Sequence, residues 1–240
     1  MLQAYAQSLY EQHPYMLVFM LAFLPLIVWI LFWRNEDLTD PEPISLSIAT
    51  VTSGCIAVFL AIPLEKIALS YITDPLHQIV VNSSIEETLK LYVVYFIAYH
   101  SRFFNESFDY IYYGVLGCLG FAFMENILFL LNHEIFSKFD SVITISQMRF
   151  LGATLLHVLA GASIGIILAL VHKSSFFVRV FGLIVALFVA IGLHSAFNYF
   201  IINSKDMGIT STLSSLWICA LIIISLAERI RFIDFYETKK

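Results

Sequence analysis

Two adjacent carboxylates begin an apolar stretch of the chain, and a lysine follows them at helical spacing. Ser84-Ile-Glu86-Glu87-Thr-Leu-Lys90 runs directly into the hydrophobic sequence 91–98. An ionisable group in membrane hydrocarbon costs at least about 2.5–3.5 kcal/mol, so it persists where it faces a polar cavity or has a function. Lys90 can reach either carboxylate across one helical turn. One carboxylate can then serve as a base or ligand while the other is oriented or protonated; a structural ion pair is the alternative.

Three further apolar segments carry acid, amide or imidazole side chains. They contain Glu125-Asn126, His157, and His194 with Asn198. Phe121 lies one helical turn before Glu125, which puts an aromatic ring on the same face as the acid. Asn198 lies one turn after His194, so its amide can orient the imidazole or bind a substrate carbonyl. A lone histidine in a helix is usually a hydrogen-bonded core residue, but four polar segments together indicate one intramembrane site.

These side chains predict hydrolytic chemistry of two kinds. His157, His194 and Glu125 supply ligand types for Zn²⁺, which would lower the pKa of a bound water and make it a nucleophile. Without a metal, Glu86 or Glu87 could activate water while histidine and asparagine stabilise the oxyanion. The sequence contains no His-Glu-x-x-His helix, no Gly-x-Ser-x-Gly and no phosphate-binding loop. The choice between a metallo- and a glutamic-type mechanism therefore stays open.

The composition predicts a polytopic membrane protein. Of its 240 residues, 60% are hydrophobic and 13% are charged, whereas apolar residues make up roughly 45–50% of a soluble domain. The mean hydropathy is +0.85. With a net charge of −5 and no run of Lys or Arg, nothing indicates binding to nucleic acid. Three cysteines inside apolar segments predict neither a disulfide framework nor a metal site.

About seven transmembrane helices are expected, because a span needs about 20 mostly apolar residues. We predict an all-α, single integral membrane domain over residues 1–240, with spans at Tyr15–Trp33, Ile44–Leu69, Ile79–Tyr99, Tyr110–Leu131, Gln147–Val171, Phe176–Ile202 and Thr212–Ile230. The third span begins with polar residues and could be broken or re-entrant instead of a straight helix.

The distribution of Lys and Arg favours an N-out, C-in orientation. The inner loops and tail then hold Arg34, Arg102, Lys173, Arg179, Arg229, Arg231, Lys239 and Lys240, and the outer side holds Lys66, Lys138, Arg149 and Lys205. With about 1.5 Å of rise per helical residue, this topology places all four polar segments roughly 10–15 Å below the outer face. We therefore expect their side chains at one level of the membrane.

The ordered set of motifs resembles the PrsW family of intramembrane proteases, over a core of roughly residues 40–202. The resemblance rests on Asp40-Pro41-Glu42-Pro43, Glu86-Glu87-x-x-Lys90, Asp109 with Tyr113-Gly114, Gly120-Phe121-Ala122-x-x-Glu125-Asn126, His157 and His194-x-x-x-Asn198. The chain is similar more distantly to CAAX prenyl proteases and bacteriocin-processing membrane proteases. Phe121-x-x-x-Glu125 favours the PrsW branch.

The resemblance implies cleavage of a membrane-anchored protein, such as an anti-sigma factor, in regulated intramembrane proteolysis. It implies a bacterial cytoplasmic membrane protein whose active site comprises Glu86, Glu87, Glu125, His157 and His194, with supporting roles for Lys90, Phe121, Asn126 and Asn198. Zinc would be the metal if one is used. Two rival hypotheses are a proton-coupled transporter or channel, since buried Glu and His also relay protons, and a non-catalytic membrane chaperone or immunity factor.

Overall fold

The protein is a bundle of long α-helices. The structure is a computed structural model that describes residues 2–37, 40–203 and 206–237, and these residues contain no β-strand. Its helices are α1 (Leu2–Gln12), α2 (Pro14–Glu36), α3 (Ile44–Tyr71), α4 (Pro75–Ile97), α5 (Ser107–Leu130), α6 (His133–Phe136), α7 (Phe139–Met148), the π-helix η1 (Arg149–Thr154), α8 (Leu155–Val171), α9 (Phe176–Asn203) and α10 (Asp206–Glu237). The prediction of an all-α protein is confirmed.

Six helical stretches are long and apolar enough to cross a membrane. They are Pro14–Glu36, Ile44–Tyr71, Ser107–Leu130, Phe139–Val171, Phe176–Asn203 and Gly208–Asp234. Six of the seven predicted spans are thus confirmed on length and composition, and the chain is a polytopic membrane protein. The span Phe139–Val171 is longer than the predicted Gln147–Val171, because α7 and η1 continue into α8 without a break.

The remaining predicted span corresponds to α4, which has 23 residues and carries Glu86, Glu87 and Lys90 in its middle. These charges distinguish it from the other six. The helix is continuous, so the alternative of a broken or re-entrant segment is not what the structure shows. Asp74 caps its N-terminus, since one carboxylate oxygen accepts the backbone N–H of His77 at 2.9 Å. Pro75, the first helical residue, needs no hydrogen bond to its nitrogen.

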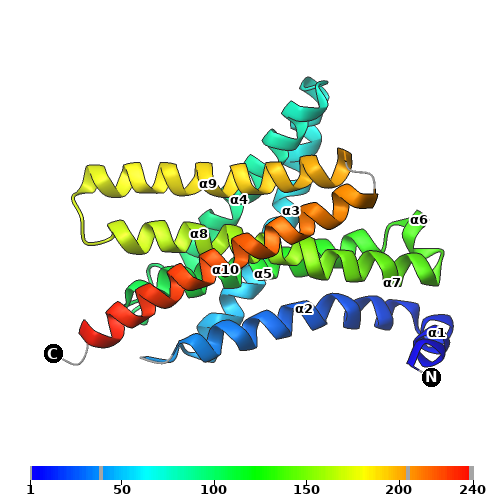
Figure 1. The fold of residues 1–240 in the computed structure, drawn as a ribbon, viewed down its shortest axis with the longest axis horizontal. Helices are drawn as coiled ribbons and strands as arrows, with labels where there is room; N and C mark the ends of the chain where they lie inside the picture. Colours follow the sequence, from blue (N-terminus) through cyan, green and yellow to red (C-terminus); the bar gives the residue numbers. More distant parts are fainter. Residues whose placement is uncertain (1, 38–39, 204–205, 238–240) are drawn as a thin grey trace.

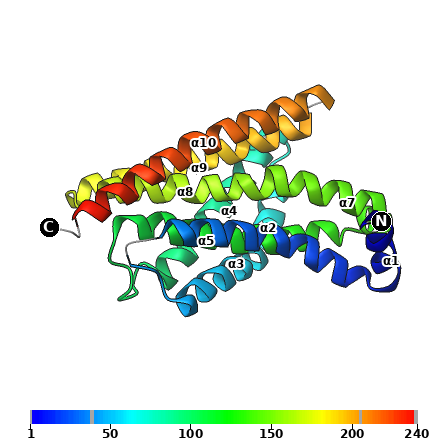
Figure 2. The ribbon, with the colours of Figure 1, turned by 60° about the horizontal axis from the view of Figure 1, so that its bottom comes forward.

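The helices α5 and α8 form the centre of the bundle. Among the six candidate spans, those that contain α5 and α8 are the most buried. Figure 1 shows α8, α9 and α10 running along the long axis of the molecule, while the α3–α4 hairpin crosses them obliquely. In the turned view of Figure 2, α2 and α5 lie below α8, with α3 beneath them. The orientation in the membrane stays a prediction, and three of the lysines that it uses, Lys205, Lys239 and Lys240, lie outside the described residues.

Glycines allow α5 to approach two of its neighbours, α8 and α3, closely. A Cβ added at Gly114 would lie 2.8 Å from the carbonyl oxygen of Gly161 on α8. On another side of α5, a Cβ at Gly120 would overlap the carbonyl group of Val51 on α3. These glycines therefore form a packing surface, and it sets the spacing of the helices around the polar residues.

Replacing Gly120 by alanine is expected to destabilise the protein. The new methyl group would collide with rigid backbone, and overpacking of this kind typically costs about 1–3 kcal/mol, occasionally more. Gly192 on α9 is the matched control, because a Cβ there would meet nothing within 4 Å. Thermal unfolding in detergent should show a lower midpoint for Gly120→Ala than for Gly192→Ala. Equal midpoints would contradict the packing role.

A buried acidic network joins the start of α3 to the start of α5. Glu42 accepts a hydrogen bond from the Tyr113 hydroxyl, and its backbone N–H donates to Asp37 at 2.9 Å. At the start of α5, Asp109 accepts the backbone N–H groups of Asn105 and Glu106 at 2.7 and 2.8 Å. Burial raises the pKa of the Glu42 carboxyl above its ordinary value, and the hydrogen bond from Tyr113 partly offsets this. The acidic prolyl stretch of the sequence is thus a structural anchor in this fold.

Glu106 should make the stability of the protein depend on pH. Burial, followed by the charges of Asp109 and Asp234, raises the pKa of Glu106 from 4.5 to about 7. Between these values the folded protein holds a proton that the unfolded chain has released, so the free energy of unfolding falls as pH rises. The wild type should therefore unfold at a higher temperature at pH 5 than at pH 8. Glu106→Gln should show a smaller pH dependence, whereas Glu134→Gln, at an exposed site, should match the wild type.

Candidate active site

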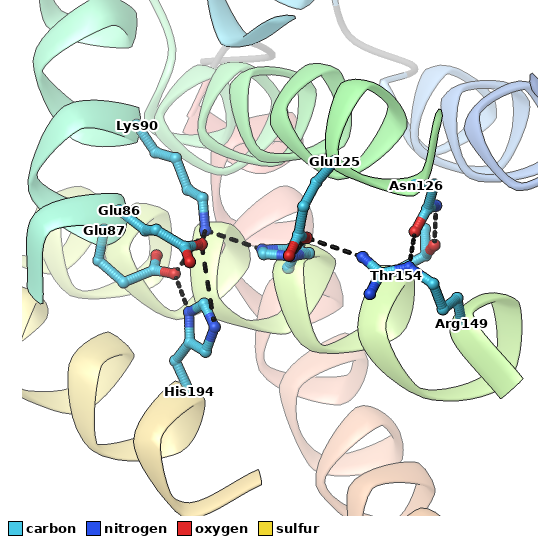
Figure 3. Close-up of polar contacts among 9 residues, drawn as sticks. Glu86, Glu87, Lys90, Glu125, Asn126, Arg149, Thr154 and His194 are labelled. Atoms are coloured by element: carbon cyan, nitrogen blue, oxygen red, sulfur yellow. Dashed lines mark hydrogen bonds and ion pairs between the residues drawn. The ribbon is translucent and has the colours of Figure 1, made fainter. Parts of the chain in front are cut away.

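Four predicted site residues from three helices meet inside the bundle. Glu86 and Glu87 come from α4, His157 from α8 and His194 from α9. Each offers one nitrogen or oxygen atom, and these four atoms all lie within 4.8 Å of one another at buried positions. Figure 3 shows the two carboxylates of α4 turned toward His194. The structure therefore brings together polar groups that are far apart in the sequence, such as Glu87 and His194, which are separated by 107 positions.

Lys90 lies at the centre of this cluster. Its ammonium nitrogen donates to Glu86 Oε2 at 3.2 Å, to Glu87 Oε1 at 2.8 Å and to His157 Nδ1 at 2.8 Å. An ammonium group has three N–H donors, so all three are used. The same nitrogen lies 4.2 Å from the centre of the Phe121 ring, within the range of a cation–π contact. The predicted supporting residues Lys90 and Phe121 thus hold one buried positive charge among the donor atoms.

Glu125 contacts the far side of His157. Because an ammonium only donates, His157 Nδ1 is the acceptor of the Lys90 bond, and Nε2 carries the proton that it donates to Glu125 Oε2 at 3.0 Å. This bond fixes the imidazole tautomer and directs the Nδ1 lone pair into the cluster. Glu125 was predicted as a possible metal ligand together with the two histidines. The structure puts it outside the group of four donors, bonded to His157 Nε2, and the assignment of Glu125 as a metal ligand stays a prediction.

Arg149 and the short π-helix complete the surroundings of Glu125. The guanidinium donates to Glu125 at 2.9 Å and to the amide oxygen of Asn126 at 2.5 Å. Asn126 in turn donates to the Thr154 hydroxyl at 3.0 Å. Arg149 and Thr154 are the first and last residues of η1, and π-helical turns often occur at functional sites. Sequence reasoning counted Arg149 only as an outer-loop charge, although a basic residue eight positions before His157 was a usable signal.

His194 bonds to the more buried of the two glutamates. Its Nδ1 lies 2.7 Å from Glu87 Oε1, and its Nε2 lies 3.9 Å from Glu86 Oε2. An ionised Glu87 accepts the Nδ1 proton, and a neutral His194 then has its Nε2 lone pair facing Glu86. Asn198, expected to orient this imidazole, takes no part in any hydrogen bond within the part of the chain that the structure describes. Glu87 therefore orients His194 in its place.

A cavity of about 280 Å³ leads to the cluster between α3, α4 and α5. It is lined by Glu65, Glu86, Phe121, Glu125 and Asn132, together with Val58, Ala61, Ile62, Leu128 and Phe129. The Glu86 side chain is 12% exposed, whereas that of Glu87 is completely buried. Glu86 is thus the carboxylate of the cluster that a substrate or water in the cavity can reach. Glu65 was missed from the sequence, although it too is an acid within an apolar helix.

The donor set fits a divalent metal ion. In the neutral imidazoles, His157 Nδ1 and His194 Nε2 carry the lone pairs, and two carboxylates lie beside them. One oxygen of Glu87, Oε2, is buried without a hydrogen-bond partner. A buried polar atom without a partner is costly, and coordination of a cation is one way to satisfy it. Imidazole and carboxylate ligands are those of catalytic zinc sites.

Comparison with known proteins gives consistent matches. The chain is 28% identical over 182 residues to "Protease PrsW" of Bacillus subtilis (strain 168), which covers 73% of this chain and 78% of that protein. It is 30% identical over 110 residues to "Protease PrsW" of Geobacillus kaustophilus (strain HTA426), covering 45% of this chain and 49% of that protein. No solved structure matches. The family described as "PrsW family intramembrane metalloprotease" matches residues 42–227, and the chain belongs to this family of intramembrane proteases.

Proposed function

We propose that this protein hydrolyses peptide bonds of membrane-anchored protein substrates, with Glu86 as the general base. One observation carries the assignment: of the two carboxylates in the cluster, only Glu86 lines the cavity. Glu87 holds Lys90 and His194 and has no access to a substrate. A general base must lie within hydrogen-bond reach of the water that it deprotonates, and the cavity beside Glu86 supports this role.

The reaction needs one water molecule and one proton shuttle. Glu86 accepts a proton from the water while the water oxygen bonds to the carbonyl carbon of the scissile peptide. The carbon–nitrogen bond then breaks, and the proton held by Glu86 passes to the leaving amine. We propose that the side-chain amide of Asn198, one helical turn after His194 and without a partner among the described residues, donates to a substrate carbonyl. Glu125 keeps His157 in the tautomer described above.

His157, His194 and Glu87 would hold the metal ion that the family description implies, with zinc as our proposal. Two imidazoles and one carboxylate form a ligand set known from catalytic zinc sites that leave one position open. When bound, zinc lowers the pKa of a coordinated water and polarises the substrate carbonyl. In this arrangement Glu86 stays free to act as the base, and Glu125 supports His157 from outside the ligand set.

The substrate class follows from the location of the site. Since His157 and His194 lie within candidate membrane-spanning helices and the α4 carboxylates cluster with them, a substrate must present its peptide bond at membrane depth. An anti-sigma factor with a transmembrane helix, cleaved in regulated intramembrane proteolysis, is the substrate we propose. The bacterial relatives support a location in a bacterial cytoplasmic membrane. With the N-terminus outside, the site would open toward the outer third of the bilayer.

Quantitative membrane proteomics tests this proposal. Cells that lack the protein would be complemented with wild type, Glu86→Gln or the exposed control Glu134→Gln at matched expression. We expect one or a few single-span proteins to accumulate, intact or as membrane stubs, only with Glu86→Gln. Identical profiles for the three strains under several stresses would contradict the protease proposal.

A further inference from the structure

The ammonium of Lys90 occupies the space among the donor atoms that a metal ion would need. It contacts one donor atom each of Glu86, Glu87 and His157 at 2.8–3.2 Å. These are three of the four residues whose donor atoms lie within 4.8 Å of one another. His157 Nδ1 is the clearest case, since its lone pair can accept from Lys90 or bind a metal but cannot do both.

We propose that Lys90 is the resident cation of the metal-free site and that a divalent metal ion enters by displacing its ammonium. The inference rests on the proposed function in taking this cluster as the metal site. It assigns to Lys90 a role that the hydrolytic reaction does not require. Lys90 holds the ligands in place before the metal arrives, and it sets how tightly the metal binds.

Charge balance at this depth supports exchange over joint occupancy. With both histidines neutral, the two carboxylates and Lys90 carry a net charge of −1. A divalent ion in place of the ammonium brings the cluster to zero, whereas both cations together would give +1. The Lys90 side chain is completely buried, and an uncompensated charge in such surroundings is costly. The two cations therefore compete for one position.

The surroundings of Lys90 give the displaced ammonium a second contact. Its nitrogen already lies 4.2 Å from the centre of the Phe121 ring. The four-carbon stem of lysine is flexible, so the ammonium can withdraw from His157 while it keeps the aromatic face. Phe121 also lines the cavity that reaches Glu86. An ammonium that stays on the Phe121 ring therefore lies beside this cavity and its acidic side chains.

Zinc binding to the purified full-length protein tests the inference without any substrate. Wild type, Lys90→Met, Lys90→Gln and the exposed-site control Lys138→Met would be stripped with EDTA in detergent. Each would then be titrated with Zn²⁺ against a chromogenic chelator. We expect both Lys90 variants to bind zinc at least about tenfold more tightly than the wild type. A tenfold difference corresponds to a wild type in which the ammonium fills the site in about nine molecules of ten. Lys138→Met should match the wild type.

Thermal unfolding provides the second measurement. Without Lys90 the stripped site keeps two carboxylates and no cation, so Lys90→Met should unfold at a lower temperature than the stripped wild type. Zinc should raise its midpoint by more than it raises that of the wild type. If Lys90→Met folds only when zinc is present, this dependence supports the inference. The zinc affinity is then measured on Lys90→Gln.

The inference would be overturned if folded Lys90 variants bound zinc as the wild type does, or less tightly, or if no variant bound zinc. Its failure can be told apart from that of the proposed function. Loss of cleavage in Glu86→Gln with unchanged zinc affinity in Lys90→Met would leave the protease and remove the exchange. Tighter zinc binding in Lys90→Met without any substrate that responds to Glu86→Gln would leave the exchange and remove the proposed protease reaction.

Discussion

Replacement of Glu86 by glutamine is expected to abolish peptide cleavage and to leave the fold unchanged. Glutamine has nearly the same shape and can still accept the hydrogen bond from Lys90, but it cannot take a proton from water. General base catalysis contributes about 10²–10⁴-fold to a rate, so cleavage should fall by about that factor. The measurement is the cleavage rate of a substrate reconstituted with the enzyme in proteoliposomes, together with the unfolding temperature of each variant.

Glu65→Gln separates the general base from the acidic character of the cavity. Glu65 lines the same cavity but is not one of the four clustered donors. If the negative charge of the cavity mattered more than the base, Glu65→Gln would lower the rate as strongly as Glu86→Gln. We expect only a small change. Retained cleavage in both Glu86→Gln and Glu87→Gln would contradict a base from the α4 pair.

The sequence was sufficient to predict that the polar groups meet, because helix geometry converts residue number into depth. With a constant rise per residue, the positions of Glu86, His157 and His194 in their spans predicted a common level. Their donor atoms do lie together in the structure. The long helices were predictable for a similar reason, since apolar length alone indicates a span.

Rotation of the helices was not predictable, and it decides the part each residue can play. Glu86 and Glu87 are adjacent, yet neighbouring residues of an α-helix point about 100° apart. Only the packing of α4 against α9 and α3 turns Glu87 inward and leaves Glu86 on the cavity. The pairing of Arg149 with Glu125 was equally hidden: Arg149 stands eight positions before His157, but its partner lies on another helix, and the π-helical turn that carries Arg149 sets its direction.

The loss of Glu87 should damage the fold before it damages the chemistry. Glu87 Oε1 is 2.8 Å from the Lys90 ammonium and 2.7 Å from His194 Nδ1, and the carboxylate is completely buried. Removing one member of a buried ion pair leaves the other charge without its partner, at a cost of about 3–5 kcal/mol. Glu87→Leu should therefore unfold at a much lower temperature than Glu86→Gln, even though the two glutamates are neighbours.

A double-mutant cycle in EDTA distinguishes a broken ion pair from lost packing. Glu87→Leu and Lys90→Met would be measured singly and together, with the free energy of unfolding as the readout. If the pair carries the effect, the double variant should be more stable than the sum of the single losses predicts, with a coupling of about 0.5–3 kcal/mol. An apolar pair of similar volume needs no counter-charge. Strictly additive losses would mean that Glu87 stabilises the helices through shape alone, and that the buried cation at Lys90 draws its support from Glu86 and His157.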